Sequence, residues 1–143
     1  MSGLPLLSVE SLSKRYGARI GCADVSFDLE PGEVLAVVGE SGSGKSTLLS
    51  CLATELMPDS GRVLYRGKDG EARDILALGE AERRLLLRTE WGFIRQDAAQ
   101  GLRMSVSAGG NVGERLMAVG ARHYGRIRAT AQDWLGRVEI GAD

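Results

Sequence analysis

The sequence is poor in the residues that build metal centres and disulfide scaffolds. Its 143 residues include two cysteines, Cys22 and Cys51, and one histidine, His123. Because the cysteines have neither zinc-ligand spacing nor a CxxC arrangement, we interpret them as small buried apolar residues in a reducing compartment. No run of 18 apolar residues occurs, and the opening MSGLPLLSVE has no basic segment before its short apolar stretch. We therefore expect neither a membrane span nor a signal peptide.

The sequence also lacks a large net charge. The chain has 18 basic and 19 acidic side chains, so it has no overall attraction to nucleic acid or anionic lipid, and nucleic-acid binding is disfavoured. Its length suits a single domain. These properties predict one cytoplasmic α/β domain.

Five segments have the apolar pattern of β-strands. Alternation of apolar and polar residues over 7–10 and 25–30 predicts two antiparallel strands with one solvated face, near a sheet edge. The segment VLAVVG, residues 34–39, is apolar throughout, which is typical of a strand covered on both faces. RVLY, residues 62–65, and WGFIRQ, residues 91–96, predict two further strands.

Other stretches predict helices. Residues 45–56 repeat leucine at helical spacing, and residues 79–90 alternate in charge sign. From residue 105 onward the pattern is helical. One face of the last helix would carry five apolar side chains: Ile127, Ala131, Trp134, Leu135 and Val138. Trp91 and Trp134 are interpreted as packing residues rather than ligand contacts.

The stretch GESGSGKST carries the clearest functional signal. It satisfies G-x-x-x-x-G-K-[ST] between an apolar segment and an amphipathic helix, the context in which this motif binds nucleoside triphosphates. Glycines let successive backbone N–H groups face phosphate oxygens, and the helix N-terminus adds further donors. The predicted binding residues are Gly39, Glu40, Ser41, Gly42, Ser43, Gly44, Lys45, Ser46 and Thr47. Within this loop Lys45 would reach the β- and γ-phosphates, Ser46 would bind Mg²⁺, and Thr47 would contact the α-phosphate.

Two side chains on either side of the loop each admit two interpretations. Tyr16 follows the first predicted strand, and its ring could stack on a purine or simply end the strand half-buried. Gln96 ends another predicted strand, and its amide could bind Mg²⁺ and orient a water or simply be solvated. The order and spacing of these residues around the loop favour the functional interpretations.

Together these elements resemble the ATP-binding-cassette (ABC) family. Tyr16, the segment 39–47 and Gln96 match the A-loop aromatic, the Walker A loop and the Q-loop of that family, and the similarity runs from about residue 7 to the end. The resemblance implies a truncated ABC-type domain of the P-loop NTPase fold. Residues 1–143 would form one partial ATP-binding domain, with a nucleotide-binding core to about residue 100 and the start of a helical subdomain from about residue 101.

The resemblance also implies cofactors and a partner. ATP and Mg²⁺ are the implied cofactors, with Ser46 and Gln96 on the metal. A second cassette subunit would form a homodimer with the longer parent protein.

The second half is similar to one branch of the family. SAGGN and GARHYG resemble stretches of the cassette subunits of the bacterial phosphonate carbon–phosphorus lyase system, which are close to the ATPases of dipeptide and oligopeptide importers. The parent would couple ATP binding and hydrolysis to the lyase complex. One alternative is an importer ATPase held at the inner membrane by a permease, with its coupling surface at Gln96. Another is a non-hydrolysing, nucleotide-dependent interaction module.

Three family elements are absent from the sequence. There is no LSGGQ-type signature, no apolar strand ending in Asp-Glu, and no switch histidine. SAGG at 107–110 follows Gln96 too closely to be the signature, and His123 comes before the region where the switch residue would lie. Hydrolysis relies on such a glutamate and on the signature loop of a second subunit. We therefore expect the N-terminal part of an ATPase subunit that does not hydrolyse ATP on its own.

Overall fold

The computed structural model describes residues 5–139, apart from the side chains of Ala98 and Gln100, and the contacts within it divide the chain into two units. Unit 1 is Met1–Arg83 and unit 2 is Arg84–Asp143. Between residues 5 and 139 no helix is both long enough and apolar enough to cross a membrane. The predicted division into core and helical subdomain near residue 100 stays a prediction.

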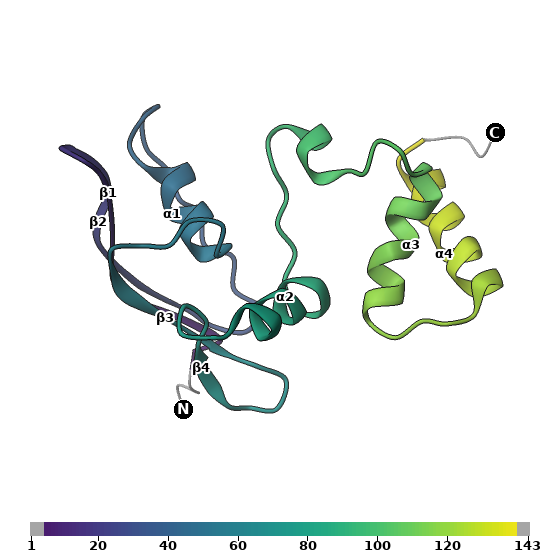
Figure 1. The fold of residues 1–143 in the computed structure, drawn as a ribbon, viewed down its shortest axis with the longest axis horizontal. Helices are drawn as coiled ribbons and strands as arrows, with labels where there is room; N and C mark the ends of the chain where they lie inside the picture. Colours follow the sequence, from purple (N-terminus) through teal and green to yellow (C-terminus); the bar gives the residue numbers. More distant parts are fainter. Residues whose placement is uncertain (1–4, 140–143) are drawn as a thin grey trace. The chain divides into compact units, whose positions relative to one another are not determined.

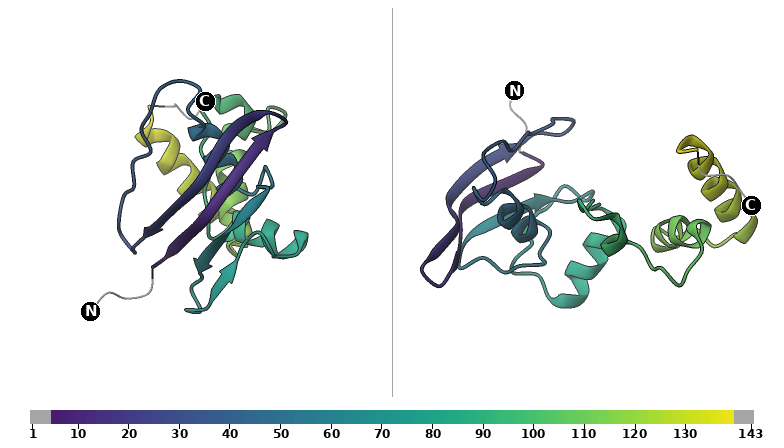
Figure 2. Two further views of the ribbon diagram at one scale, coloured as in Figure 1. Left: turned by 90° about the vertical axis from the view of Figure 1, so that its left-hand side faces the viewer. Right: turned by 90° about the horizontal axis from the view of Figure 1, so that it is seen from above.

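Unit 1 is an antiparallel sheet with one helix (Figures 1 and 2). Its strands are β1 (Leu7–Tyr16), β2 (Arg19–Leu29), β3 (Ser60–Arg66) and β4 (Ala72–Asp74), in the order β2-β1-β3-β4. Helix α1 (Lys45–Leu52) packs against β2. The predicted antiparallel strands and the predicted helix after the glycine loop are therefore confirmed.

The core of unit 1 lies between the sheet and α1. Its buried apolar side chains are Val9, Leu12, Cys22, Leu48, Cys51, Ala53, Val63 and Ile75. Both cysteines are free and buried, as predicted from their spacing. Burial raises the pKa of Cys51 to about 11, so this thiol stays protonated and unreactive at neutral pH.

Three β-bulges interrupt the long β1–β2 hairpin, and two of them contain a non-glycine residue with a positive φ. Ser11 in β1 and Asp24 in β2 each have a positive φ, at 47° and 50°. Side chains of the opposite strand hold both backbones in place: Ser26 Oγ accepts from Ser11 N, and Ser13 Oγ accepts from Asp24 N, both at 2.8 Å. The hydroxyls thus supply the hydrogen bonds that the ladder loses where an extra residue is inserted.

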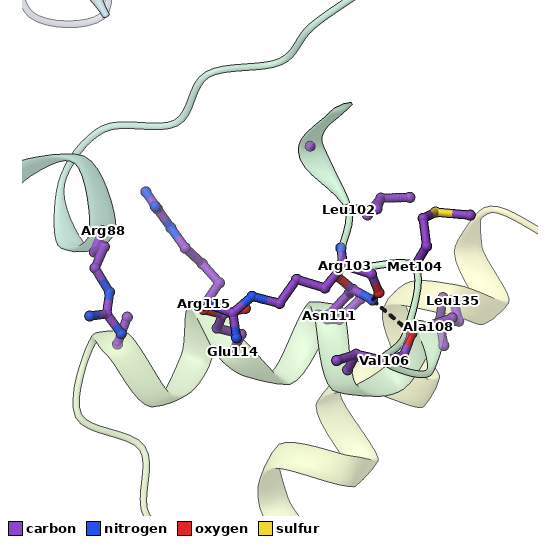
Figure 3. Close-up of a pocket in the computed structure, with 13 residues that line it drawn as sticks. Arg88, Leu102, Arg103, Met104, Val106, Ala108, Asn111, Glu114, Arg115 and Leu135 are labelled. Atoms are coloured by element: carbon purple, nitrogen blue, oxygen red, sulfur yellow. Dashed lines mark hydrogen bonds and ion pairs between the residues drawn. The ribbon is translucent and has the colours of Figure 1, made fainter. Parts of the chain in front are cut away.

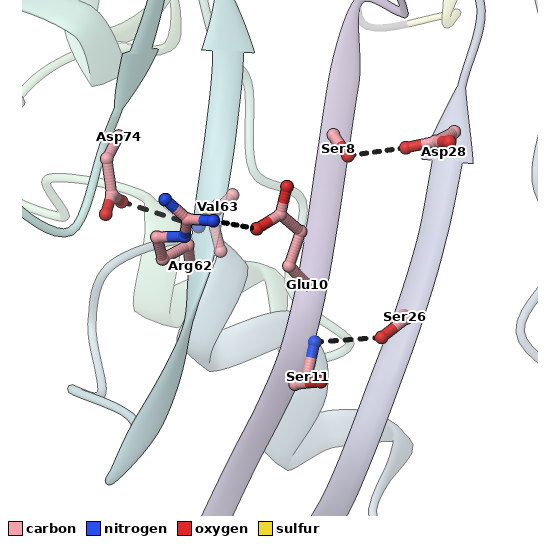
Figure 4. A network of polar contacts seen from close by, with 8 residues as sticks. All are labelled: Ser8, Glu10, Ser11, Ser26, Asp28, Arg62, Val63 and Asp74. Atoms are coloured by element: carbon pink, nitrogen blue, oxygen red, sulfur yellow. Dashed lines mark hydrogen bonds and ion pairs between the residues drawn. The ribbon is translucent and has the colours of Figure 1, made fainter.

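The bulge in β1 changes which residues face the core. Val9 and Leu12 are both buried although they are three residues apart, because the extra residue shifts the alternation by one. Polar contacts then tie the outer face of the strands together (Figure 4). Glu10 pairs with Arg62 of β3 at 2.6 Å, and Asp74 Oδ1 accepts from Val63 N at 3.4 Å.

Hydrogen bonds to Asp59 stabilise the end of β1. Its carboxylate accepts hydrogen bonds from Lys14 Nζ at 2.9 Å and from Arg15 N at 2.7 Å, while its own N–H donates to Ser13 O at 2.8 Å. The Lys14 hydrogen bond lowers the pKa of Asp59, and Asp59 raises the pKa of Lys14. This loop residue therefore fixes the strand just before Tyr16.

Two predicted strands do not form. Segment 34–39 has no strand partner among the described residues, and Val34 and Val38 are 92% and 87% exposed. Segment 91–96 is irregular as well, with Ile94 95% exposed. Both predictions were wrong for this chain because an apolar run becomes a strand only when a neighbouring strand takes up its N–H and C=O groups.

Unit 2 is helical. Its elements after the end of α2 (Glu80–Thr89) are the short helix η1 (Ala98–Gly101), α3 (Ala108–Ala118) and α4 (Tyr124–Arg137). Helices α3 and α4 pack together, and each begins with a side-chain cap: Ser107 Oγ accepts from Gly110 N, and His123 Nδ1 accepts from Arg126 N.

The apolar face predicted for α4 is only partly buried. Ala131 is buried, but Trp134 and Val138 are 53% and 62% exposed. The Arg137 guanidinium lies 4.8 Å from the centre of the Trp134 ring, so a cation rather than the core covers this indole.

Replacing Asp59 by Asn is expected to remove an acid-sensitive part of the stability. Because the pKa of Asp59 is lowered in the folded chain, its charged form stabilises the fold above the ordinary carboxyl pKa of about 3.9. This stabilisation is lost as the pH falls through the lower folded pKa. Thermal unfolding should give a lower Tm for Asp59→Asn at neutral pH, and the two Tm values should converge once the pH falls below the lowered folded pKa. A difference that stays constant from neutral to acid pH would contradict this role.

Candidate functional site

The glycine loop leads into the N-terminus of α1. Gly39, Gly42 and Gly44 have φ values of 156°, 83° and 95°, of which the last two lie in the left-handed region that favours glycine. Gly44 is the N-cap of α1, and in the described chain no side chain caps this helix end. The first turn also contains no acidic residue. Uncapped N–H groups and the positive end of the helix dipole therefore converge on one point, as an anion requires.

The Lys45 side chain folds back over the loop. Its ammonium group donates to Gly39 O at 2.7 Å, to Glu40 O at 2.6 Å and to Ser43 Oγ at 3.2 Å. All three donor positions of the ammonium are used. The Lys45 ammonium therefore stabilises the conformation of the loop, and it is the same group that the motif predicts to bind the β- and γ-phosphates.

Two glycines, Gly44 of the loop and Gly21 of β2, let the loop pack closely against the sheet. A Cβ added to Gly44 would lie 1.8 Å from the carbonyl oxygen of Gly21. Gly21 is the extra residue of a third bulge, since Ile20 and Cys22 pair with consecutive residues of β1 and leave Gly21 without a partner. The bulge thus lets the carbonyl of Gly21 approach the start of α1 closely.

The same glycine makes room for Tyr16. A Cβ on Gly21 would come within 2.8 Å of Thr47 Cγ2 and 2.9 Å of the Tyr16 ring. Tyr16 Oη and Thr47 Oγ1 are 3.5 Å apart. The structure therefore brings together the predicted base-stacking residue and the predicted phosphate loop, which are far apart in the sequence.

These residues line a cavity of about 520 Å³ in unit 1. Its lining consists of Tyr16, Arg19, Ile20, Gly21, Gly42, Gly44, Lys45, Ser46 and Thr47. Most of the predicted binding residues are thus found at one site. Gly39, Glu40 and Ser43 contribute through their hydrogen bonds to Lys45, while Ser41 is exposed in the loop.

A second cavity, of about 670 Å³, lies within unit 2 (Figure 3). Its lining includes the apolar residues Leu102, Met104, Val106, Val112 and Leu135. Two of its three arginines are already engaged: Arg103 pairs with Glu114 at 3.0 Å, and Arg115 donates to the Leu87 and Trp91 carbonyls. The phosphate-loop cavity is therefore the better candidate, because its cations and N–H groups converge at a helix N-terminus.

Gln96 lies apart from the loop in the chain. It belongs to unit 2, is exposed and follows the irregular segment 91–95. Its predicted role at the metal stays a prediction.

Comparison with known proteins identifies the family. The model of the ABC transporter family matches residues 22–142. The chain belongs to this family. Members of this ABC family bind ATP or ADP, which agrees with the phosphate loop of the chain.

Two curated relatives of this ABC chain are informative. The ATP-binding protein PhnK of Escherichia coli (strain K12), named for phosphonates utilization, is 59% identical over 139 residues, which are 97% of this chain and 53% of PhnK. An ATP-binding protein of Brucella abortus (strain 2308), named for peptide import, is 33% identical over 125 residues, which are 81% of this chain and 37% of that protein. The ABC chain thus spans about half the length of PhnK.

A solved structure confirms the predicted fold class. The dimeric cassette MJ0796, a bacterial ABC transporter cassette, matches with a TM-score of 0.77 at 27% identity, over 93% of this chain and 57% of its own. A second structure of MJ0796, in a post-hydrolysis state with ADP and Pi, matches with a TM-score of 0.76 at 26% identity and the same coverage. The ABC chain therefore has the fold of part of an ATP-binding cassette.

Sequence reasoning missed two contributors to the site of this ABC chain. Gly21 was not singled out, although a single glycine inside a strand pattern is a sign of a bulge or a close backbone approach. Arg19 was also missed, because nothing in its local pattern separates it from an ordinary solvated arginine.

Replacing Gly44 by Ala is expected to disrupt the junction between loop and sheet. The left-handed backbone alone costs about 1–2 kcal/mol for a residue with a Cβ, and the overlap with Gly21 O adds to that cost. Tm should fall by at least about 4 °C, and nucleotide binding should weaken, as calorimetry and thermal unfolding would measure.

Gly136→Ala is the matched control for this change. Gly136 lies in α4, and an added Cβ there would meet nothing within 4 Å. This variant should keep nucleotide binding and change stability by no more than about 1 kcal/mol, in the stabilising direction. A Gly44→Ala chain as stable as the Gly136→Ala chain would show that the loop does not rest on Gly21.

Proposed function

We propose that this chain is the ATP-binding part of a cytoplasmic cassette subunit of the phosphonate carbon–phosphorus lyase system. In the longer protein, ATP binding and hydrolysis would drive changes in the enzyme complex. The observation that carries the proposal is the 59% identity to PhnK over 97% of the chain. The peptide-import relative, at 33% identity over 81% of the chain, gives weaker support to the importer alternative.

The site geometry supports a nucleoside triphosphate as ligand. The Lys45 ammonium brings positive charge to the cavity, and the uncapped N-terminus of α1 offers N–H donors to a phosphate chain. Tyr16 borders the same cavity and is half-exposed, so its ring face is open to a base. The loop would bind the phosphates and Tyr16 the adenine.

The metal in this proposal is Mg²⁺. The Ser46 hydroxyl lines the cavity beside Lys45 and is exposed, and oxygen donors of this kind suit Mg²⁺. Gln96 would supply a second oxygen from its amide and position the attacking water. In the whole protein, Gln96→Ala should slow hydrolysis more than it weakens ATP binding; equal loss of both would contradict this role.

Hydrolysis is proposed for the longer protein only. The 143 residues include no apolar strand ending in Asp-Glu and no LSGGQ-type signature, so the groups that polarise water and close over the γ-phosphate are not among them. MJ0796 is a dimer in its solved structure. By analogy we propose that two copies of the whole protein pair around ATP.

Replacing Lys45 by Ala is expected to abolish measurable ATP binding. A charge-assisted hydrogen bond to phosphate contributes about 2 kcal/mol or more, which corresponds to at least a ~30-fold loss of affinity. Titration of ATP and Mg²⁺ by isothermal calorimetry measures the effect. Lys68→Ala, which removes an exposed lysine elsewhere in unit 1, is the control and should bind like wild type. Binding by Lys45→Ala at wild-type affinity would refute the assignment of the loop.

Growth on phosphonate distinguishes the proposed function from peptide import. Cells that lack the whole gene should fail to grow with a phosphonate as the sole phosphorus source, but should grow on phosphate and take up peptides normally. The whole gene with Lys68→Ala should restore growth, and the gene with Lys45→Ala should not. Normal growth on phosphonate together with lost peptide uptake would favour the importer.

A further inference from the structure

We propose that Arg19 is a second phosphate-binding cation of this site, placed to contact the α-phosphate of the bound nucleotide. The inference rests on the proposed function, because it assumes that the cavity holds a nucleoside polyphosphate. It adds a residue that lies outside the phosphate-loop motif.

The hairpin fixes the position of Arg19. It is the first residue of β2 and pairs with Tyr16, the last residue of β1, across the two-residue turn Gly17–Ala18. Both residues line the 520 Å³ cavity together with Lys45. The strand pairing therefore places Arg19 next to Tyr16, the residue proposed to stack on the base, whereas Lys45 belongs to α1.

The Arg19 side chain has no acidic partner among residues 5–139, unlike four other arginines. Arg62, Arg73, Arg103 and Arg137 each pair with a carboxylate. The Arg19 side chain makes no hydrogen bond or ion pair with any of residues 5–139, and it is exposed. Its five N–H donors are thus available to a ligand.

The charges around the cavity favour an anion near Arg19. Arg19 and Lys45 are the charged residues in the lining, and no carboxylate accompanies them. Two cations that share a cavity repel each other, and a polyanion between them removes that repulsion. Since Lys45 is assigned to the β- and γ-phosphates, the phosphate closest to Tyr16 and Arg19 is the α-phosphate. A planar guanidinium can bind two of its oxygens at once.

The test measures ATP and ADP affinity of the full chain as wild type, Arg19→Ala and Arg19→Lys. Arg19→Ala should bind both nucleotides about three- to tenfold more weakly at low salt, a modest effect because the contact is exposed to solvent. The difference from wild type should shrink at high salt, because salt screens a charge contact of this kind. Arg19→Lys should recover part of the affinity, since it keeps the charge and loses the planar fork.

Arg128→Ala is the matched control. Arg128 is exposed on α4 and lines neither cavity, so its loss changes the net charge equally and should leave both affinities unchanged. The Tm of Arg19→Ala should equal that of wild type, because the side chain has no partner in the described part of the fold.

The outcomes separate the two proposals. Failure of wild type to bind ATP would overturn the proposed function itself. Normal binding by wild type with unchanged affinity in Arg19→Ala would overturn only the role of Arg19. A loss of affinity that is equally large at low and high salt would indicate stacking on the base, and would overturn the contact with the α-phosphate.

Discussion

The close approach of the Gly44 backbone to the carbonyl of Gly21 determines how this site is built. The carbonyl oxygen of Gly21 occupies the place that a side chain on Gly44 would take, and a side chain on Gly21 would overlap Thr47. The phosphate loop can therefore pack against the β1–β2 hairpin in this way only when both residues are glycine. That contact sets the distance between α1 and Tyr16. The Tyr16 ring, proposed to stack on the base, and the Lys45 ammonium, proposed to bind phosphate, come from different elements and line one cavity.

The β-bulges of the β1–β2 hairpin, rather than its regular strand pairing, bring Gly21 close to Gly44. Bulges at Ser11, Asp24 and Gly21 each insert an extra residue, and serine hydroxyls from the facing strand satisfy the first two. Asp59 then holds the end of strand β1 through hydrogen bonds from the Lys14 side chain and the Arg15 backbone N–H. A straight hairpin of the same length would end elsewhere, so the bulges help to position the residues that line the cavity.

Much of the site could be predicted from the sequence because its signals are local. The motif Gly39–Thr47 can be recognised by itself, since its glycines, its lysine and the helix start follow each other in the sequence. Tyr16 could be placed by its spacing from that loop. Gly21 carried only the general signal of a glycine inside a strand, and Asp59 carried none, because their roles depend on contacts between elements that lie far apart in the chain. The strand predicted at 34–39 failed for a related reason: its apolar pattern describes a covered strand, and the cover must come from a partner that the described residues do not supply.

The exposed segment 34–38 has a consequence for solubility. Val34, Leu35, Val37 and Val38 form a short uncharged stretch rich in β-branched residues and free of proline, the composition that favours stacking of identical chains into cross-β ribbons. Glu33 and Glu40 flank it on both sides, and like charges brought into register repel each other. Charge repulsion between these glutamates would therefore oppose self-association of chains through this stretch.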